Sequence, residues 1–244
     1  MEYNMSFPRE LQRVNENRIP AVICGGTVEY HGPHCSYGCD TLVAEGLIKK
    51  LAEKKEIMIL PTIYYSPSSY AVADKSSGTV HIEEDVFEAY LFQIFTNMLH
   101  AGLRNIYVVI HHQFEQESLM PMTLSYMKAA KRATMRYLEE TQGLGWWGSE
   151  NYATYYENLG GGDDPFSWIK VIPTMSTEVQ NATGYDHAGK YECSILMSLY
   201  PDAVKLERLG DINHWFTKSA AEASKEIGDE MVAKSLEYLE KKIV

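Results

Sequence analysis

Glu29, His31 and Asp40 are the residues whose types and spacing best suit chemistry. In Glu29-Tyr30-His31 the two polar residues are two positions apart, so in an extended chain both side chains point to the same side. Asp40 comes at the start of an expected helix, from where its carboxylate can reach the same point. Mixed carboxylate and imidazole ligands suit Zn²⁺, Mn²⁺ or Fe²⁺, and a bridging carboxylate suits two metals about 3.5–4 Å apart. The spacing predicts a metal site, although polar residues in a glycine- and proline-containing surface loop would give the same pattern.

Two later clusters could join this site. His111 and His112 follow an expected buried strand, at the end where parallel sheets usually bind ligands. Asp186 and His187 come shortly before Glu192, which puts a candidate proton-transfer histidine near a carboxylate at the start of an expected helix. Each of these clusters is a weak signal by itself.

The cysteines offer a rival site. Cys35 and Cys39 lie near His31 and His34 in the sequence, so these four residues could bind a structural zinc. Their spacing is not a common zinc-ribbon pattern, and the sequence has no second closely spaced pair. With four cysteines in 244 residues, we expect free thiols in a reducing compartment.

The elements around these residues alternate between short apolar strands and amphipathic helices. Strands are expected within residues 19–24, 57–62, 105–110 and 168–174, and helices over 41–51, 83–101, 118–140, 192–200 and 215–242. In the helix over 83–101, one face carries Val86, Tyr90, Ile94 and Met98. This alternation is typical of a three-layer α/β/α fold, in which helices flank a mostly parallel sheet.

Composition narrows the possible partners. The formal net charge of −11 argues against nucleic acid, whose binding proteins usually carry a basic stripe. One basic cluster occurs at helical spacing and predicts a solvated helix face: Lys128, Lys131, Arg132 and Arg136.

No apolar run approaches the ~20 residues that span a bilayer, and no secretion signal is visible at the start. We therefore expect a cytoplasmic protein with no membrane partner. The absence of repeats and linkers predicts a single domain over residues 1–244.

Residues 19–34, followed by Gly38-Cys39-Asp40, strongly resemble the creatininase (creatinine amidohydrolase) family. The family signature there is Gly-Ser-x-Glu-Gln-His-Gly-Pro-His-Leu-Pro, followed by Asp. The resemblance continues at residues 102–112, which are similar to a strand that ends in Asn-Gly-His. It also includes Asp186-His187-Ala188-Gly189 with Glu192, which looks like a late His-Ala-Gly-x-x-Glu-Thr motif. In all, it covers most of residues 18–199.

The resemblance implies a hydrolase with two divalent metal ions, Zn, Mn or Fe. By position, Glu29 and His31 would each bind one metal, Asp40 would bridge both, and His112 would complete the first site. A water held between the metals would attack a carbonyl or imine-like carbon, and His187 would be the proton donor. The family also implies a homo-oligomer, with a hexamer as the expectation.

This chain departs from the family pattern at several positions. The family's glutamate ligand falls on Phe114, which cannot bind metal, so Glu192 or, as a weaker alternative, Glu115 would serve the second metal. Leu-Pro-Leu becomes Cys35-Ser36-Tyr37, and Cys193 follows Glu192 where the family has threonine. These differences change the wall of the pocket and leave the substrate open.

Five further residues are candidate substrate contacts. His111 and Gln113, which flank the metal histidine, could hydrogen-bond to ring hydroxyls, and Asp186 stands beside the proton donor. Trp146 and Trp147 lie between glycines, which fits a lid over the substrate or, alternatively, a packed surface or subunit contact.

Three functions remain compatible with the sequence. The first is a cyclic amidohydrolase that cleaves a C–N bond in a cyclic amide or formamide. The second is a C–C hydrolase that opens a cyclic diketone of inositol catabolism. The third is a non-catalytic sensor or scaffold that kept the fold after it lost a metal.

Overall fold

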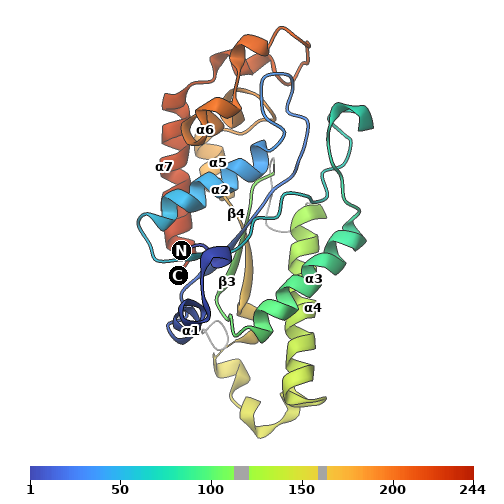
Figure 1. The fold of residues 1–244 in the computed structure, drawn as a ribbon, viewed down its shortest axis with the longest axis vertical. Coiled ribbons are helices and arrows are strands. Elements are labelled where there is room, and N and C mark those ends of the chain that lie inside the picture. Colours follow the sequence, from blue (N-terminus) through green and yellow to red (C-terminus); the bar gives the residue numbers. More distant parts are fainter. Residues whose placement is uncertain (113–120, 159–163) are drawn as a thin grey trace.

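The computed structural model of the chain describes residues 1–112, 121–158 and 164–244 (Figure 1). Its centre is a parallel sheet with the strand order β2-β1-β3-β4. The strands are β1 (Ala21–Gly25), β2 (Met58–Ile59), β3 (Ile106–Ile110) and β4 (Ile169–Pro173). The predicted parallel sheet is confirmed. β2 is shorter than the expected strand over 57–62, and Pro61, which has no N–H to donate, follows closely after it.

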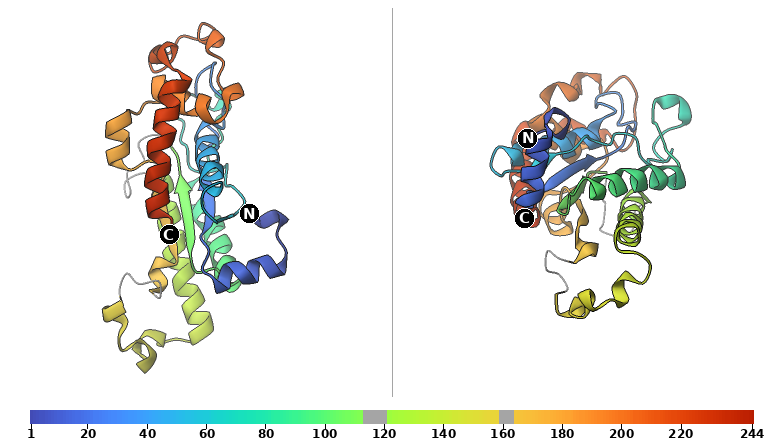
Figure 2. Two further views of the ribbon diagram at one scale, coloured as in Figure 1. Left: turned by 90° about the vertical axis from the view of Figure 1, so that its left-hand side faces the viewer. Right: turned by 60° about the horizontal axis from the view of Figure 1, so that its bottom comes forward.

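Helices cover both faces of this sheet, which confirms the predicted three-layer arrangement (Figures 1 and 2). Two separate groups of buried apolar residues make up the layers between sheet and helices. One layer involves α2 (Cys39–Ala52), α6 (Lys190–Leu199) and α7 (Lys225–Lys242), beside the short α5 (Thr177–Thr183). The other involves α1 (Pro8–Glu16), α3 (Glu84–His100) and α4 (Pro121–Gln142).

The strands supply both layers because their side chains alternate between the two faces of the sheet. In β1, Val22 and Cys24 belong to the layer under α2, whereas Ala21 and Ile23 belong to the layer under α3 and α4. All five residues of β1 and of β3 are buried. A strand that is covered on both faces has to be apolar throughout, which is why its sequence shows an apolar run without polar alternation.

α3 buries a different face from the one that the sequence suggested. Phe87, Leu91, Phe95 and Leu99 are buried, whereas Val86 and Tyr90 are 59% and 55% exposed. Apolar residues occur on two adjacent faces of this helix, and the larger aromatic side chains of one face enter the core beside α4. Helical spacing alone does not distinguish between the two faces.

The C-terminal helix begins later than expected. Residues from Trp215 were predicted to be helical, but α7 starts at Lys225, where the side chain of Ser224 accepts a hydrogen bond from the Ile227 amide at 3.3 Å. This serine is an N-cap, the usual start of a helix. The preceding residues form only a 3₁₀ segment, η9 (Lys218–Glu222). α1 and α5 were not anticipated from the sequence.

Short 3₁₀ turns follow α4. They are η3 (Trp146–Gly148), η4 (Glu150–Tyr152) and η5 (Tyr155–Asn158), and η6 (Pro165–Ser167) leads into β4. Figure 1 shows these yellow segments at the foot of α4. The remaining 3₁₀ turns are η1 (Tyr3–Met5), η2 (Lys75–Ser77), η7 (Pro201–Ala203) and η8 (Leu206–Arg208). Within the described parts of the chain, no helix is both long and apolar enough to cross a membrane.

Candidate metal centre

Asp40 is held by the loop that follows β1. Gly26 in that loop packs so closely on α2 that an added Cβ would lie 2.5 Å from the backbone nitrogen of Thr41. A larger residue at position 26 would therefore separate the loop from the helix. This contact brings the Thr27 hydroxyl onto Asp40, to whose carboxylate it donates a hydrogen bond. One carboxylate oxygen is thereby fixed.

His31 is oriented by its own backbone. Its Nδ1 donates to the carbonyl oxygen of Glu29 at 3.0 Å, which leaves Nε2 to face the interior. Nε2 lies 3.7 Å from Oδ1 of Asp40 and 3.4 Å from Oε2 of Glu192. A histidine whose second nitrogen is fixed by a carbonyl oxygen is the usual arrangement of a metal ligand.

His111 and His112 extend the cluster from the end of β3. Nε2 of His112 is 3.5 Å from Oε2 of Glu29, and Nε2 of His111 is 3.8 Å from Oε1 of Glu192. Nδ1 of His111 is fixed at 2.8 Å from the hydroxyl of Thr174, just after β4. The two neighbouring histidines therefore face two different carboxylates.

Among the described residues, four sets of three side chains in this cluster have ligand atoms that all lie within 4.8 Å of one another. They are Glu29 with His31 and His187, His31 with Cys39 and Glu192, Glu29 with Asp40 and His112, and Asp40 with His111 and Glu192. Asp40 links the last two sets, as a bridging carboxylate would. The residues of these last two sets, and His31, are each at most 6% exposed. The structure thus brings together Glu29, His31, Asp40, His112 and Glu192, which the sequence suggested as metal ligands.

Glu192 is placed by the first turn of α6. The carboxylate of Asp186 accepts hydrogen bonds from the amides of Tyr191 at 3.1 Å and Glu192 at 3.0 Å. Oε2 of Glu192 in turn accepts from the amide of Ala188 at 2.6 Å. Asp186 was expected to contact substrate, but both of its oxygens are engaged with the helix. It therefore positions Glu192.

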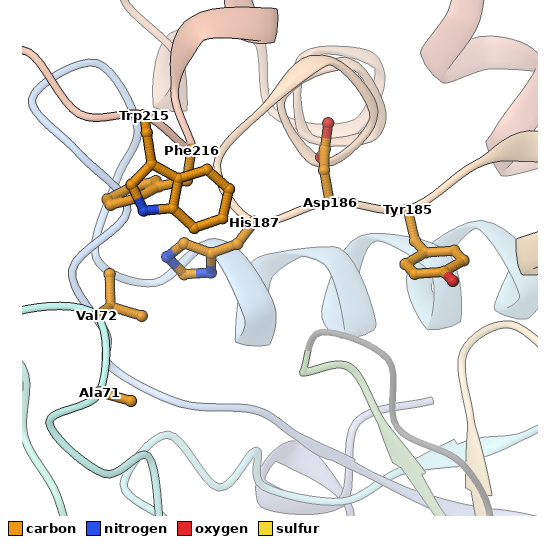
Figure 3. Close-up of a pocket in the computed structure, with 7 residues that line it drawn as sticks. All are labelled: Ala71, Val72, Tyr185, Asp186, His187, Trp215 and Phe216. Atoms are coloured by element: carbon orange, nitrogen blue, oxygen red, sulfur yellow. The ribbon is translucent and has the colours of Figure 1, made fainter.

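His187 lies between the cluster and a cavity. Its Nε2 donates to the carbonyl oxygen of Tyr30 at 3.2 Å, and its Nδ1 is 4.0 Å from Oε2 of Glu29. The cavity measures about 430 Å³, and the other residues that line it are Ala71, Val72, Tyr185, Asp186, Trp215 and Phe216. Figure 3 shows the His187 ring beneath Trp215 and Phe216, whereas the Asp186 carboxylate points away from it.

The charges of the cluster influence one another strongly. Burial by itself lowers the pKa of His31, but the carboxylates of Glu192 and Asp40 outweigh it and raise the pKa well above its usual value. Burial tends to raise the pKa values of Asp40 and Glu192, yet the neighbouring imidazoles hold both below the usual range. Burial lowers the pKa of His111. The carboxylates are therefore ionised at neutral pH, as metal ligands must be.

Several buried atoms of the cluster have no hydrogen-bond partner among the described residues. They are Oε2 of Glu29, Nε2 of His31, Oδ1 of Asp40 and Nε2 of His111. Leaving a buried polar atom unsatisfied costs about 1–3 kcal/mol, and more when it is charged. Divalent cations among these oxygen and nitrogen atoms would satisfy them together, so the residues fit the metals that the sequence suggested.

Two other sequence-based candidates lie elsewhere. Trp146 and Trp147 are in η3, beyond the end of α4, and Trp146 packs on Tyr152. A 22-residue helix is roughly 33 Å long, so within one chain α4 carries this pair away from the cluster. Neither tryptophan lines the cavity beside His187, and their role as a lid stays a prediction. Gln113, Phe114 and Glu115 lie outside the described residues.

The sequence did not identify the aromatic wall of the cavity. Trp215 and Phe216 were assigned to a helix that in fact starts after them. His111 was assigned to substrate, whereas its Nε2 faces Glu192 inside the cluster. The sequence did contain a signal for this placement of His111. It is adjacent to His112, and two imidazoles at the end of one strand can face two different carboxylates.

Comparison with known proteins agrees with this geometry. The model of the creatininase family, described as creatinine amidohydrolase, matches residues 5–243. The creatinine amidohydrolase of Pseudomonas putida is 21% identical over 189 residues, which make up 76% of this chain and 66% of that protein. The match thus spans slightly less than two thirds of the relative's own length.

Solved structures show the same fold. A creatininase structure designated "Mn" superposes with a TM-score of 0.71 and 16% identity, over 99% of this chain and 98% of the other. A mutant creatininase designated "Zn-Zn type" gives 0.70 and 17% identity, over 99% and 98%. At these identities the likeness establishes the fold.

Proposed function

The chain belongs to the creatininase family, and from that premise we propose that it is a dinuclear metal-dependent hydrolase that opens a small cyclic substrate. The bond cleaved is a C–N bond of a cyclic amide or formamide. The observation that carries this proposal is that Asp40 shares one three-residue set with Glu29 and His112 and another with His111 and Glu192.

The ligands divide into two groups around Asp40. Glu29 and His112 would hold one divalent cation, His31 and Glu192 would hold the other, and Asp40 would contact both. His111 faces Glu192. The neighbours designated "Mn" and "Zn-Zn type" favour manganese or zinc.

When bound, two such cations lower the pKa of a shared water and offset the negative charge that develops on the attacked carbon's oxygen. His187 would move the proton. Because its Nε2 is anchored to the carbonyl of Tyr30, Nδ1 is the atom that faces the cluster. Nδ1 would accept a proton as the substrate is attacked and return it to the leaving nitrogen, which is the role of a general acid–base.

The aromatic cavity would bind and enclose the substrate ring. Trp215 and Phe216 line the cavity that reaches His187, on the side opposite Ala71 and Val72 (Figure 3). Flat rings pack well on aromatic faces, and such contacts contribute about 0.5–1.5 kcal/mol beyond buried area. A small planar ring bound there would present its carbonyl toward the cluster.

The proposal is tested with protein reconstituted with Zn²⁺ or Mn²⁺ and a panel of creatinine, other cyclic amides, formamides and cyclic diketones. We expect turnover of at least one cyclic amide or formamide, abolished by a chelator and restored by metal. Turnover of the diketones alone would replace C–N by C–C cleavage. Full metal content without turnover of any cyclic compound would contradict the hydrolase proposal.

The proposal also covers the oligomeric state of the protein and its cellular compartment. We propose that the chain forms one domain and acts in the cytoplasm as a homo-oligomer. Light scattering coupled to size exclusion measures the oligomeric state directly, and a monomer at micromolar concentration would contradict that part of it.

A further inference from the structure

His81 holds in place the loop that forms one wall of the cavity. It lies between η2 and α3, and its side chain is 14% exposed. Its Nδ1 accepts hydrogen bonds from the backbone amides of Ser68 at 3.2 Å and Ser69 at 3.0 Å. The loop that contains these serines continues into Ala71 and Val72, which line the cavity (Figure 3). Two hydrogen bonds to one ring nitrogen therefore fix the backbone just before the wall.

Ser69 has a backbone conformation that needs such support. Its φ is 65°, in the left-handed region that residues with a side chain rarely adopt. A conformation of this kind persists where the surrounding contacts impose it. The amide of Ser69 donates to His81, and the hydroxyl of Ser69 accepts a hydrogen bond from the amide of Ala71 at 3.3 Å. The position of Ala71 thus depends on the contact with His81.

The segment that carries His81 is itself attached to the loop of the candidate metal centre. Two residues before His81, the hydroxyl of Thr79 accepts a hydrogen bond from the amide of Tyr30 at 3.0 Å. Tyr30 lies between the proposed metal ligands Glu29 and His31. Through these contacts, His81 connects the wall of the cavity to the loop that carries the ligands.

We propose that His81 is a positioning residue that sets the distance between this wall and the metal centre, and thereby determines which rings the site accepts. Among the described residues, His81 does not itself line the cavity, so it acts through the backbone of the loop. The two wall residues of the loop lie opposite Trp215 and Phe216 (Figure 3). A shift of the loop would change the width available to a flat ring. This role in binding rests on the proposed function, whereas the hydrogen bonds to His81 do not.

A metal site is the alternative use of His81, and its hydrogen bonds disfavour it. His81, Glu83 and Glu84 have ligand atoms within 4.8 Å of one another, and both glutamates are exposed. Because Nδ1 accepts from two amides, the proton of the neutral ring is on Nε2, which lies 3.7 Å from Oε2 of Glu83. A metal at Nε2 would move that proton to Nδ1, where it would face two N–H donors.

The experiment compares His81→Asn with His81→Leu. The two new side chains have the same branched shape, but only asparagine can place an oxygen acceptor close to the position of Nδ1. Hydrogen–deuterium exchange is measured by mass spectrometry on peptides that cover residues 66–72. In His81→Leu we expect exchange there to be about 10-fold faster, because the acceptor is lost, and in His81→Asn we expect it to stay within about 3-fold of wild type. Unchanged exchange in peptides from β3 verifies that each variant is folded.

Steady-state kinetics of the metal-loaded variants tests the effect on binding. With the cyclic substrate that the wild type turns over best, His81→Leu should raise KM by about 10-fold and leave kcat within about 3-fold, the pattern of lost binding. His81→Asn should keep KM near the wild-type value. His100→Asn is the control, because this histidine pairs with Glu140 on the surface, and it should change neither KM nor the exchange of residues 66–72.

Other results would overturn the proposal. Unchanged exchange of residues 66–72 in His81→Leu would show that the loop does not depend on the imidazole. Faster exchange with an unchanged KM would show that the loop does not control binding. A zinc ion bound by the wild type and lost from both His81 variants, with unchanged exchange, would establish the metal alternative. Exchange needs no turnover, so its failure is distinguishable from failure of the proposed hydrolase.

Discussion

His31 and His187 lie ring against ring, with centroids 4.4 Å apart and planes inclined by 32°. The two rings face different ways: Nε2 of His31 points to Asp40 and Glu192, and Nδ1 of His187 points to Glu29 from the side of the cavity. This arrangement predicts that metal binding and proton transfer can be separated by changing one ring at a time.

His187→Gln is expected to lower kcat by about 10²–10⁴-fold, the usual contribution of a general acid–base, while metal content stays at the wild-type level. His31→Gln is the companion variant, and it should lose metal. Steady-state kinetics and elemental analysis on the same preparations distinguish the two. Equal metal loss in both variants would show that His187 is a ligand instead.

Asp40→Asn should reduce bound metal from about two ions per chain to fewer than one, because an amide bridges two cations poorly. Glu53→Gln provides the control, since it makes the same chemical change at an exposed position beside the end of α2. Elemental analysis after gel filtration measures both. Two retained ions in Asp40→Asn would rule out a bridging role.

Trp215→Ala should raise KM by about 10-fold and leave kcat within about 3-fold of wild type, because the ring lines the cavity without touching the cluster. The residue is 82% exposed, so the free energy of unfolding should not change. Trp147→Ala is the matched control, with an expected wild-type KM. A comparable rise in KM for Trp147→Ala would mean that η3 reaches the cavity of another copy.

Gly228→Ala should destabilise the protein by about 3 kcal/mol, because a Cβ there would lie 1.9 Å from the carbonyl oxygen of Ser194 and push α7 away from α6. For a chain of this size, that corresponds to a fall in Tm of roughly 6–12 °C. Gly210→Ala, where an added Cβ meets nothing within 4 Å, should be nearly neutral. Calorimetry of the two variants checks the contrast, and equal Tm values would contradict the close packing.

Glu88 gives a pH-dependent contribution to stability. Burial favours its neutral form, but Lys128 at 2.7 Å and Arg132 outweigh this and lower its pKa. The ion pairing of Glu88 therefore contributes its full stabilisation above the pKa that this carboxyl group has in the unfolded chain. That stabilisation is lost as the pH falls through the lower pKa that the group has in the folded protein. Glu88→Gln should cost about 1 kcal/mol at pH 7 and progressively less at acidic pH, in urea unfolding at both neutral and acidic pH. A constant difference would refute the ion pairing.

The sequence predicted the parts of this molecule that depend on neighbouring residues. β1 and β3 are apolar runs covered on both faces, and the polar residues that follow them had to meet at one edge of the sheet. The pairing of Glu29 with His31, and of His111 with His112, follows from local spacing. The basic residues of α4 were expected on a solvated face, and Lys128 and Arg132 are indeed half or more exposed while they pair with Glu88.

The features that the sequence did not predict depend on long-range packing. Nothing local shows that Cys193 meets His34, or that Trp215 and Phe216 approach His187. α3 carries two adjacent apolar faces, and only its contact with α4 decides which one is buried. The direction in which α4 carries Trp146 and Trp147 likewise follows from the whole fold.

The depth of the cluster has a consequence for metal choice. Because none of the proposed ligand residues is more than 6% exposed, an ion seated among them can be exchanged only when loops and the first turn of α6 move apart. The rate at which a chelator removes the metal would then be set by that opening movement. A metal taken up during folding would be replaced by another only as fast as the site opens.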